Sequence, residues 1–371
     1  MLRKINHKIL SGERITGRDA LALFRSDDIF SLGRMASRIA RKKNGRKAYF
    51  VVNRHINPTN ICINRCKFCA FSRSRGQEGA FELTVGEIIE KLRAGQRAKS
   101  GASAMRGSSL LTPRSSLLFR EVHIVGGLHP DWPFEHYCTM LREIRKAFPS
   151  IAIKAFTAVE IDYFSRISGL SVRVVLERLK ESGLQAMPGG GAEIFAERIR
   201  KKLCPEKISG ERWLDVHRTA HLCGIRTNAT MLYGHLESYE ERVDHLLRLR
   251  ALQDATNGFQ AFIPLAYHPG NTDIGGSYTS GLDDLRTIAV SRLVLDNIPH
   301  IKAYWIMLGE KIAQISLLFG ADDLDGTVIE EKITHSAGAM SGEGITREEL
   351  VTLIRKAGKV PVERDAFYHP V

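Results

Sequence analysis

Three cysteines crowd into eight positions of the chain, at Cys62, Cys66 and Cys69. Thiolates are the soft ligands that iron–sulfur clusters take, and most four-iron clusters take four of them. Three closely spaced cysteines therefore leave one iron of a [4Fe–4S] cluster without a protein ligand. The motif predicts a cluster whose open iron is free to bind a small molecule.

The amino and carboxylate groups of S-adenosylmethionine suit such an open iron, and an electron from the cluster would cleave the C5′–S bond of this cofactor. The alternative is a zinc site, but zinc motifs usually bring ligands as two pairs at Cys-x2-4-Cys spacing. The other cysteines, Cys138, Cys204 and Cys223, are scattered along the chain. We expect them to be structural thiols. This cysteine usage favours a metal site in a reducing, cytoplasmic compartment over a disulfide framework.

Two glycine-rich segments follow expected strands. Gly126 and Gly127 come directly after an apolar run, and paired glycines there let a ligand approach the backbone. Three glycines at 189–191 form a second bare loop, which Glu193 follows. A carboxylate at that place would accept hydrogen bonds from ribose hydroxyls or from the cofactor's amino group. The alternative is a surface acid, because carboxylates are mostly exposed.

Strands and helices alternate along most of the chain, which indicates βαβ units around a parallel sheet. Short apolar runs predict strands at 48–52, 121–125, 151–156, 186–187, 227–232, 260–265, 302–307 and 324–328. About eight such units predict a (β/α)8 barrel with its active site at the carboxyl ends of the strands. The cysteine motif follows the first of these runs, so it would lie at the mouth of the barrel.

Three segments lie outside this pattern. Residues 1–47 predict an N-terminal helical extension, the barrel would occupy 48–335, and residues 336–371 would form a C-terminal helical tail. A Ser-, Gly- and Arg-rich stretch at about 98–116 predicts a flexible insertion.

The net charge of +13 is unevenly distributed. Residues 1–47 hold 13 Lys and Arg against four acidic residues, and residues 93–120 hold six and no acid. These basic segments have little aromatic character, so we interpret them as solvated faces and expect no nucleic-acid partner. No run of about 18 apolar residues exists, and the N-terminus lacks a secretory apolar stretch, so we expect neither a membrane span nor export.

The chain resembles the aminofutalosine (6-amino-6-deoxyfutalosine) synthases, radical S-adenosylmethionine enzymes of the futalosine route to menaquinone. The resemblance covers roughly residues 45–368. It rests on the segments 54–60, 69–71, 121–130, 154–161, 188–195, 228–235, 262–265, 304–309 and 320–327. Pro58 stands where the family pattern leads us to expect Tyr, and the 98–116 insertion is longer than expected.

The resemblance implies the fold, the reaction and the partners. The fold is a radical S-adenosylmethionine (β/α)8 barrel. The 5′-deoxyadenosyl radical adds to the vinyl carbon of 3-[(1-carboxyvinyl)oxy]benzoate, and the adduct rearranges, loses a carboxylate and gives aminofutalosine, while methionine is released. The cofactor is thus consumed by a transferase that needs an electron donor such as flavodoxin or ferredoxin. Besides the three cysteines, we expect Phe68, Gly126, Gly127 and Glu193 to contact the cofactor.

Two other functions remain open at the level of sequence. One is the sister radical enzyme, cyclic dehypoxanthinylfutalosine synthase, in which the adenosyl radical abstracts hydrogen instead of adding. The other is a non-enzymatic iron–sulfur redox or binding protein. We predict that His55 separates the chain from its sister as a catalytic residue that contacts substrate or handles a proton. The alternative is a buried histidine bonded to a neighbouring strand. Arg54, Arg73 and Arg226 are candidates for holding the substrate carboxylates.

Overall fold

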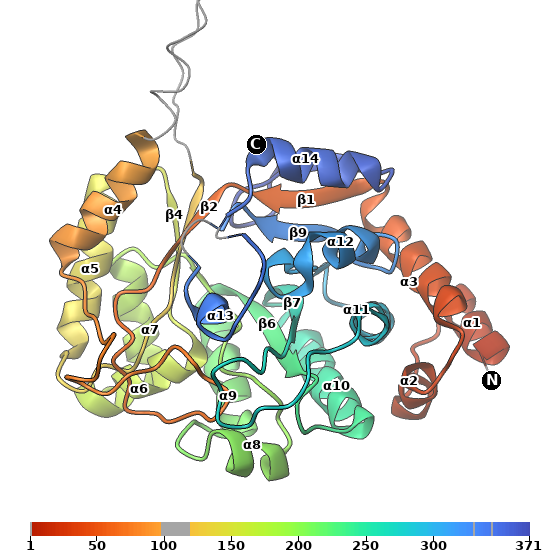
Figure 1. The fold of residues 1–371 in the computed structure, drawn as a ribbon, viewed down its shortest axis with the longest axis horizontal. Helices are drawn as coiled ribbons and strands as arrows, with labels where there is room; N and C mark the ends of the chain where they lie inside the picture. The colour runs from red at the N-terminus through yellow and green to blue at the C-terminus, as the bar shows by residue number, and fades with distance from the viewer. Residues whose placement is uncertain (1, 98–118, 329–330, 343) are drawn as a thin grey trace, which may run out of the picture.

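The centre of the protein is a curved sheet of seven parallel strands in the order β2-β3-β4-β5-β6-β7-β8 (Figure 1). The structure is a computed structural model that describes residues 2–97, 119–328, 331–342 and 344–371. The strands are β2 (Asn53–Ile56), β3 (Glu121–Ile124), β4 (Ala152–Ala155), β5 (Ala186–Met187), β6 (Arg226–Tyr233), β7 (Phe259–Ala266) and β8 (His300–Ile301). Nearly all strand residues are buried, as expected for strands covered on both faces.

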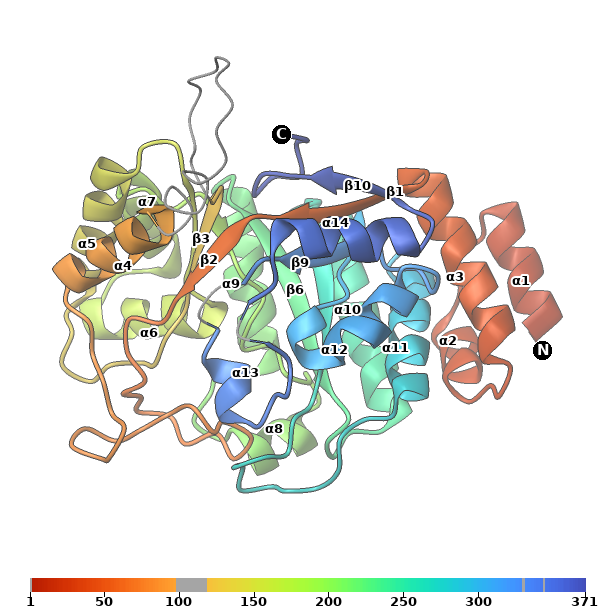
Figure 2. The ribbon, with the colours of Figure 1, turned by 45° about the horizontal axis from the view of Figure 1, so that its top comes forward.

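Helices cover the outer side of this curved sheet (Figures 1 and 2). They are α4 (Val85–Arg97), α5 (Phe134–Ala147), α6 (Ala158–Ser168), α7 (Val172–Glu181), α9 (Gly210–Leu222), α10 (Tyr239–Thr256), α11 (Gly281–Val294) and α12 (Trp305–Ser316). The short helix α8 (Glu197–Leu203) lies instead beside the loops at the carboxyl ends of the strands. Several begin at a side-chain cap, such as Thr157, whose hydroxyl accepts from the Glu160 N–H before α6. The arrangement confirms the predicted α/β barrel, with seven strands in the main sheet.

The run at 48–52 is not the first barrel strand. It is β1 (Lys47–Val51) of a second parallel sheet, in which it lies between β10 (Val360–Glu363) and β9 (Asp323–Gly326). The chain passes from β1 into the barrel at Asn53. The backbone N–H of Asn53 donates to Thr327 Oγ1 at 3.1 Å, which holds this crossover to the chain just after β9.

The second sheet occupies the place of the expected eighth barrel strand. The run at 324–328 overlaps β9, which pairs with β1. Lys302, just after β8, forms a single parallel bridge with Asp323 in β9. Because β1 leads directly into β2, the second sheet spans the gap between β8 and β2.

The prediction of a strand at 302–307 is wrong. The strand there is β8, which ends at Ile301, and α12 begins at Trp305. Periodicity cannot separate a short apolar strand from the first turn of a buried helix. Trp305 is fully buried and donates from its indole N–H to the Gly326 carbonyl at 2.8 Å, which fixes the start of α12 against β9.

The N-terminal segment forms α1 (Leu2–Ser11), α2 (Gly17–Phe24) and α3 (Ile29–Asn44). Of these, α3 packs on α11 and α2 on α10. The tail after residue 335 is not only helical. It contains α14 (Arg347–Lys356) and then β10, which pairs in parallel with β1 (Figure 2).

The insertion expected at 98–116 lies outside the described residues. Within the described part of the chain, no helix combines the length and the apolar character that crossing a membrane requires.

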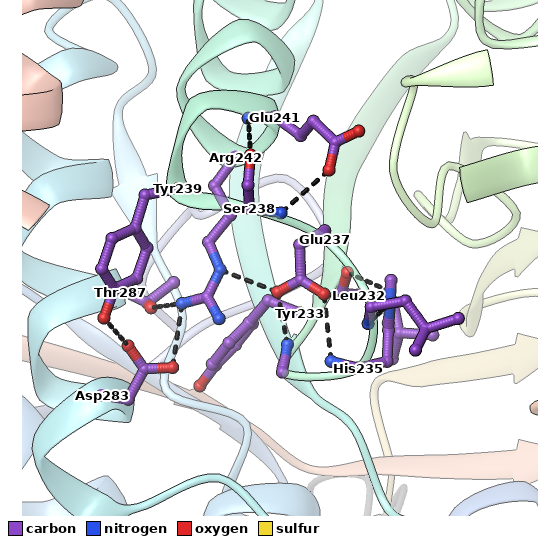
Figure 3. A network of polar contacts seen from close by, with 12 residues as sticks. Leu232, Tyr233, His235, Glu237, Ser238, Tyr239, Glu241, Arg242, Asp283 and Thr287 are labelled. Carbon is purple, nitrogen blue, oxygen red and sulfur yellow. Dashed lines mark hydrogen bonds and ion pairs between the residues drawn. The ribbon is translucent and has the colours of Figure 1, made fainter. Parts of the chain in front are cut away.

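A buried polar network holds the segment after β6 (Figure 3). The Glu237 carboxylate lies 2.9 Å from His235 Nδ1 and 2.8 Å from Arg242 Nε, and Arg242 also contacts Asp283 at 2.9 Å. Burial by itself raises the pKa of Glu237, but His235 and Arg242 lower it to about 2. The network fixes the end of β6, whose Leu232 lines the central cavity.

We expect Glu237→Gln to lower the free energy of unfolding by roughly 3 kcal/mol at pH 7, since a carboxyl pKa near 2 reflects interactions of that size. The folded pKa lies below the unfolded value, so this stabilisation is present above about pH 4.5 and is lost as pH falls toward 2. Urea denaturation at pH 7 and pH 3 should show the difference between wild type and variant shrinking at pH 3. Glu240→Gln, at a half-exposed carboxylate in the first turn of α10, is the control and should change stability little at either pH. A pH-independent loss in Glu237→Gln would contradict the assignment.

Candidate active site

A cavity of about 330 Å³ lies inside the curved sheet, at the carboxyl ends of its strands. Its lining includes the three cysteines of the motif, both glycine-rich loops and a wall of polar side chains. The short helix α13 (Ile333–Ser336) contributes Ile333 and Thr334. The cavity therefore unites segments from β2 to the C-terminal region around one space.

The cysteine motif forms an irregular loop after β2, tied down by backbone hydrogen bonds. Ile63 N–H donates to the Leu128 carbonyl at 3.0 Å, and Cys69 N–H donates to the Cys66 carbonyl at 2.9 Å. Cys66 is buried, while Cys62 and Cys69 are partly exposed, and all three line the cavity. The three thiols that the sequence groups together thus line one cavity, and their role as cluster ligands stays a prediction.

The donor set fits an iron–sulfur cluster. Burial raises the pKa of the Cys66 thiol to about 12 and also raises that of Cys62, so both are neutral in the free protein and would release protons on binding iron. In the described part of the chain, no three His, Cys, Asp or Glu side chains converge closely enough to hold one ion. Each cysteine of a cluster binds a different iron, so the three thiols do not need to meet at one point.

The first glycine loop passes very close to the cysteine loop. A Cβ on Gly127 would lie 2.2 Å from the Ile61 carbonyl oxygen and 3.1 Å from Cys62 Cβ. Gly126 N–H donates to Glu160 Oε1 at 3.2 Å. The two glycines thus allow a backbone approach that a larger residue would block.

We expect Gly127→Ala to displace the cysteine loop, because the atom that its methyl group would meet belongs to the backbone. Iron content after anaerobic reconstitution should fall several-fold, and reductive cleavage of S-adenosylmethionine should fall with it. Gly86→Ala is the matched control, since the nearest atom to its Cβ is a side-chain oxygen 3.9 Å away and the site lies in α4. Normal iron content in a folded Gly127→Ala protein would show that the close approach does not matter.

Glu193 is not a surface acid. It is buried, and its Oε1 lies 2.6 Å from Lys207 Nζ. The Lys207 ammonium also lies 4.9 Å from the centre of the Phe68 ring. Burial alone would lower the pKa of Lys207, but the nearby Cys66 and Glu193 raise it overall, so the lysine stays charged. A fixed cation therefore links the acid after the second glycine loop to the aromatic ring inside the cysteine motif.

Glu160 was missed by sequence reasoning, although it lines the cavity beside Gly126. Its carboxylate accepts from the Thr157 N–H at 2.7 Å as the return bond of a capping box. The Thr-x-x-Glu spacing signals such a box, but it does not show that the acid also faces a cavity. Burial raises the pKa of Glu160 to about 7.

His55 lies on the cavity wall and is buried, with its ring stacked on His123 at a centroid distance of 4.5 Å. Burial lowers the pKa of His55, so the imidazole is neutral near pH 7. His55 thus faces the cavity inside the barrel, and its catalytic role stays a prediction. His123, Lys154 and Lys302 also line the cavity and were not singled out from the sequence.

The three arginines considered as carboxylate partners are not among the residues that line the cavity. Arg73 donates to the Ala70 carbonyl, and the exposed Arg226 donates to a backbone carbonyl. The positive groups of the cavity are lysines. Of the remaining cysteines, Cys138 and Cys204 are buried and Cys223 is partly buried, and none lines the cavity.

Comparisons with known proteins agree with this geometry. A family model of the radical SAM superfamily matches residues 56–249, and the model described as the CofH/MqnC C-terminal region matches residues 256–371. Methylornithine synthase (PylB) superposes with a TM-score of 0.72 at 18% identity, covering 96% of this chain and 97% of that one. That likeness concerns the fold.

Sequence relatives are similar over almost the full chain. An aminodeoxyfutalosine synthase of Thermus thermophilus is 46% identical over 99% of this chain and 95% of its own length. The aminodeoxyfutalosine synthase of Streptomyces coelicolor is 43% identical over 99% of this chain and 93% of its own length. A 5-amino-6-(D-ribitylamino)uracil–L-tyrosine 4-hydroxyphenyl transferase of Methanopyrus kandleri is 41% identical over 93% of this chain and 90% of its own length. This similarity was not among the functions expected from the sequence. The chain belongs to the radical S-adenosylmethionine superfamily and, within it, to the family of the aminodeoxyfutalosine synthases.

Proposed function

We propose that the protein binds a [4Fe–4S] cluster and S-adenosylmethionine and transfers the 5′-deoxyadenosyl group to 3-[(1-carboxyvinyl)oxy]benzoate. The product is aminodeoxyfutalosine, an intermediate on the way to menaquinone. The observation that carries the proposal is a single cavity that joins the three thiols to a wall of histidines and lysines. One end suits the cluster and its cofactor, and the other suits an acidic organic substrate.

Cys62, Cys66 and Cys69 would hold the cluster, and when bound it supplies the electron that splits S-adenosylmethionine into methionine and the adenosyl group. Gly126 and Gly127 bring the loop after β3 against the cysteine loop, where the methionine part would bind. The second glycine loop and Glu193 would accept hydrogen bonds from the ribose hydroxyls. The barrel wall around the cavity would shield the reacting carbon from water on that side, which protects a reactive species from side reactions.

The electron must come from outside the protein. We propose a small redox protein such as a flavodoxin or ferredoxin as donor. The cysteine loop is the place for it to approach, because Arg65 and Lys67, next to the cluster ligands, are exposed.

We expect Glu193→Gln to weaken S-adenosylmethionine binding by about 10- to 150-fold, because a hydrogen bond to a charged acceptor contributes roughly 1.5–3 kcal/mol. The cluster should be retained, since the substitution preserves the shape of the side chain. The dissociation constant is measured anaerobically on cluster-loaded protein without reductant. Glu197→Gln, at an exposed position on α8, is the control. An unchanged dissociation constant for S-adenosylmethionine would leave Glu193 with a structural role only.

Two other reactions compete with the proposed one. The protein from Methanopyrus kandleri is named for a transfer between L-tyrosine and 5-amino-6-(D-ribitylamino)uracil. Cyclic dehypoxanthinylfutalosine synthase would release 5′-deoxyadenosine, because its radical abstracts hydrogen. Identities of 46% and 43% to the two aminodeoxyfutalosine synthases, against 41% to the Methanopyrus kandleri protein, favour the addition reaction over the transfer from L-tyrosine.

The deciding experiment incubates reconstituted protein anaerobically with dithionite, S-adenosylmethionine and 3-[(1-carboxyvinyl)oxy]benzoate. Mass spectrometry should find aminodeoxyfutalosine and methionine in equal amounts. A parallel reaction receives L-tyrosine and 5-amino-6-(D-ribitylamino)uracil instead. A product only in the parallel reaction, or only 5′-deoxyadenosine in the first, would overturn the proposal.

A further inference from the structure

Three neighbouring strands place polar side chains in one row inside the barrel. His55 on β2 pairs in register with His123 on β3, which pairs in register with Lys154 on β4. Residues in register on adjacent parallel strands point to the same face of a sheet. All three line the cavity, so the row faces its interior.

The row contains a buried donor or acceptor without a partner. His55 is 92% buried, being 8% exposed, and its Nε2 atom has no hydrogen-bond partner in the described part of the chain. An unpaired buried polar atom costs roughly 1–3 kcal/mol, so such an atom on a cavity wall points to a ligand. The ring of His123 stacks on that of His55, with 16° between the ring planes, so the two imidazoles present adjacent edges.

The cations around the row are already neutralised. Lys154 Nζ lies 2.6 Å from Glu121 Oε2, and Lys302 Nζ lies 2.7 Å from Asp325 Oδ1. An incoming anion would therefore find two imidazoles as its direct donors, with the ammonium groups behind them. Imidazole N–H groups donate well to carboxylate oxygens.

The row lies within the strands, whereas the cofactor end of the cavity is built from the loops that follow them. His55 lies in β2 and His123 in β3, and the cysteine loop and Gly126–Gly127 come after the carboxyl ends of these two strands. The proposed cofactor site lies among these loops, so the reacting vinyl group must face that end of the cavity. A group bound at the row is thus at the far end of the substrate.

We infer that His55 and His123, backed by Lys154, bind the ring carboxylate of the substrate and orient the enolpyruvyl group toward the cofactor. This inference rests on the proposed function and adds His123 as a second binding residue. The row selects a benzoate-type acid, because a substrate without the ring carboxylate leaves the imidazoles unpaired. The carboxylate that the reaction expels lies at the other end of the molecule.

The test measures binding without turnover, on cluster-loaded protein with S-adenosylmethionine and no reductant, by anaerobic calorimetry. The two probes are 3-[(1-carboxyvinyl)oxy]benzoate and 2-phenoxyprop-2-enoate, which lacks only the ring carboxylate. His123→Leu should weaken binding of the first by about 10- to 100-fold and leave the second unchanged. His123→Gln keeps an N–H donor and should recover much of the affinity.

Equal weakening of both probes would show a structural role for His123 and overturn the inference, as would unchanged binding of both. His136→Leu is the control, because His136 lies on α5 and is not among the cavity-lining residues. Turnover assays of wild type keep the two proposals apart. Wild type that makes no aminodeoxyfutalosine refutes the proposed function. If wild type is active but His123→Leu changes the binding of both probes equally, only this inference is refuted.

Discussion

Cys66→Ala is expected to abolish the formation of aminodeoxyfutalosine and most of the cluster absorbance. The thiol is buried in the loop after β2, and losing it removes an iron ligand. No other thiol lines the cavity besides Cys62 and Cys69, so among the described residues no cysteine there replaces it. Iron content and visible absorbance after anaerobic reconstitution, together with product by mass spectrometry, measure the effect. Full iron and normal turnover in this variant would refute the central assignment.

Cys138→Ala is the matched control for that experiment. Cys138 is equally buried, but it lies on α5 and not on the cavity wall. Its substitution should leave iron content unchanged, as should Cys204→Ala and Cys223→Ala. A loss of one cluster's iron in a still-folded control variant would show that the cluster is held differently.

His55→Asn is expected to keep the cluster and the cleavage of S-adenosylmethionine, but to lower the ratio of aminodeoxyfutalosine to 5′-deoxyadenosine about 10-fold or more. The imidazole lies on the cavity wall within β2, whereas the cysteine loop follows that strand, so the change should disturb substrate positioning rather than cofactor cleavage. Cleavage without a positioned vinyl group yields 5′-deoxyadenosine. Both products are quantified in one anaerobic assay.

His136→Asn is the control for His55→Asn and should keep the wild-type product ratio. An unchanged ratio in His55→Asn would remove the catalytic role. Loss of the cluster in that variant would instead indicate a structural role. The family resemblance singled out His55, but it did not show what His55 contacts.

Local patterns predicted the parts of the site that local spacing controls. The cysteine triad, the glycines at 126–127 and the acid at Glu193 were all identified from neighbours in sequence, and the structure brings them to one cavity. The prediction failed where two conformations satisfy the same local pattern. The run at 302–307 reads equally as a strand or as a buried helix start, and only the bond of Trp305 to Gly326 decides between them.

The polar row was predictable only in part. Lys154 and Lys302 stand in apolar runs, and a lysine there is a signal, because a buried charge needs a partner. The sequence does not show that the partner of Lys154 is Glu121, which lies 33 positions away. It likewise does not show that Lys207 pairs with Glu193 across a helix and a loop.

The sequence by itself predicted the three cysteines that we propose as cluster ligands, the alternation of strands and helices, and hence the edge of the sheet at which the cavity lies. These follow from spacing along the chain, which one stretch of residues specifies. Only the tertiary structure decided that 47–51 leaves the barrel for a second sheet and that His55, His123 and Lys154 form one row. Strand register and sheet partner depend on residues far apart in sequence, because burial and hydrogen bonding are satisfied between strands rather than within them.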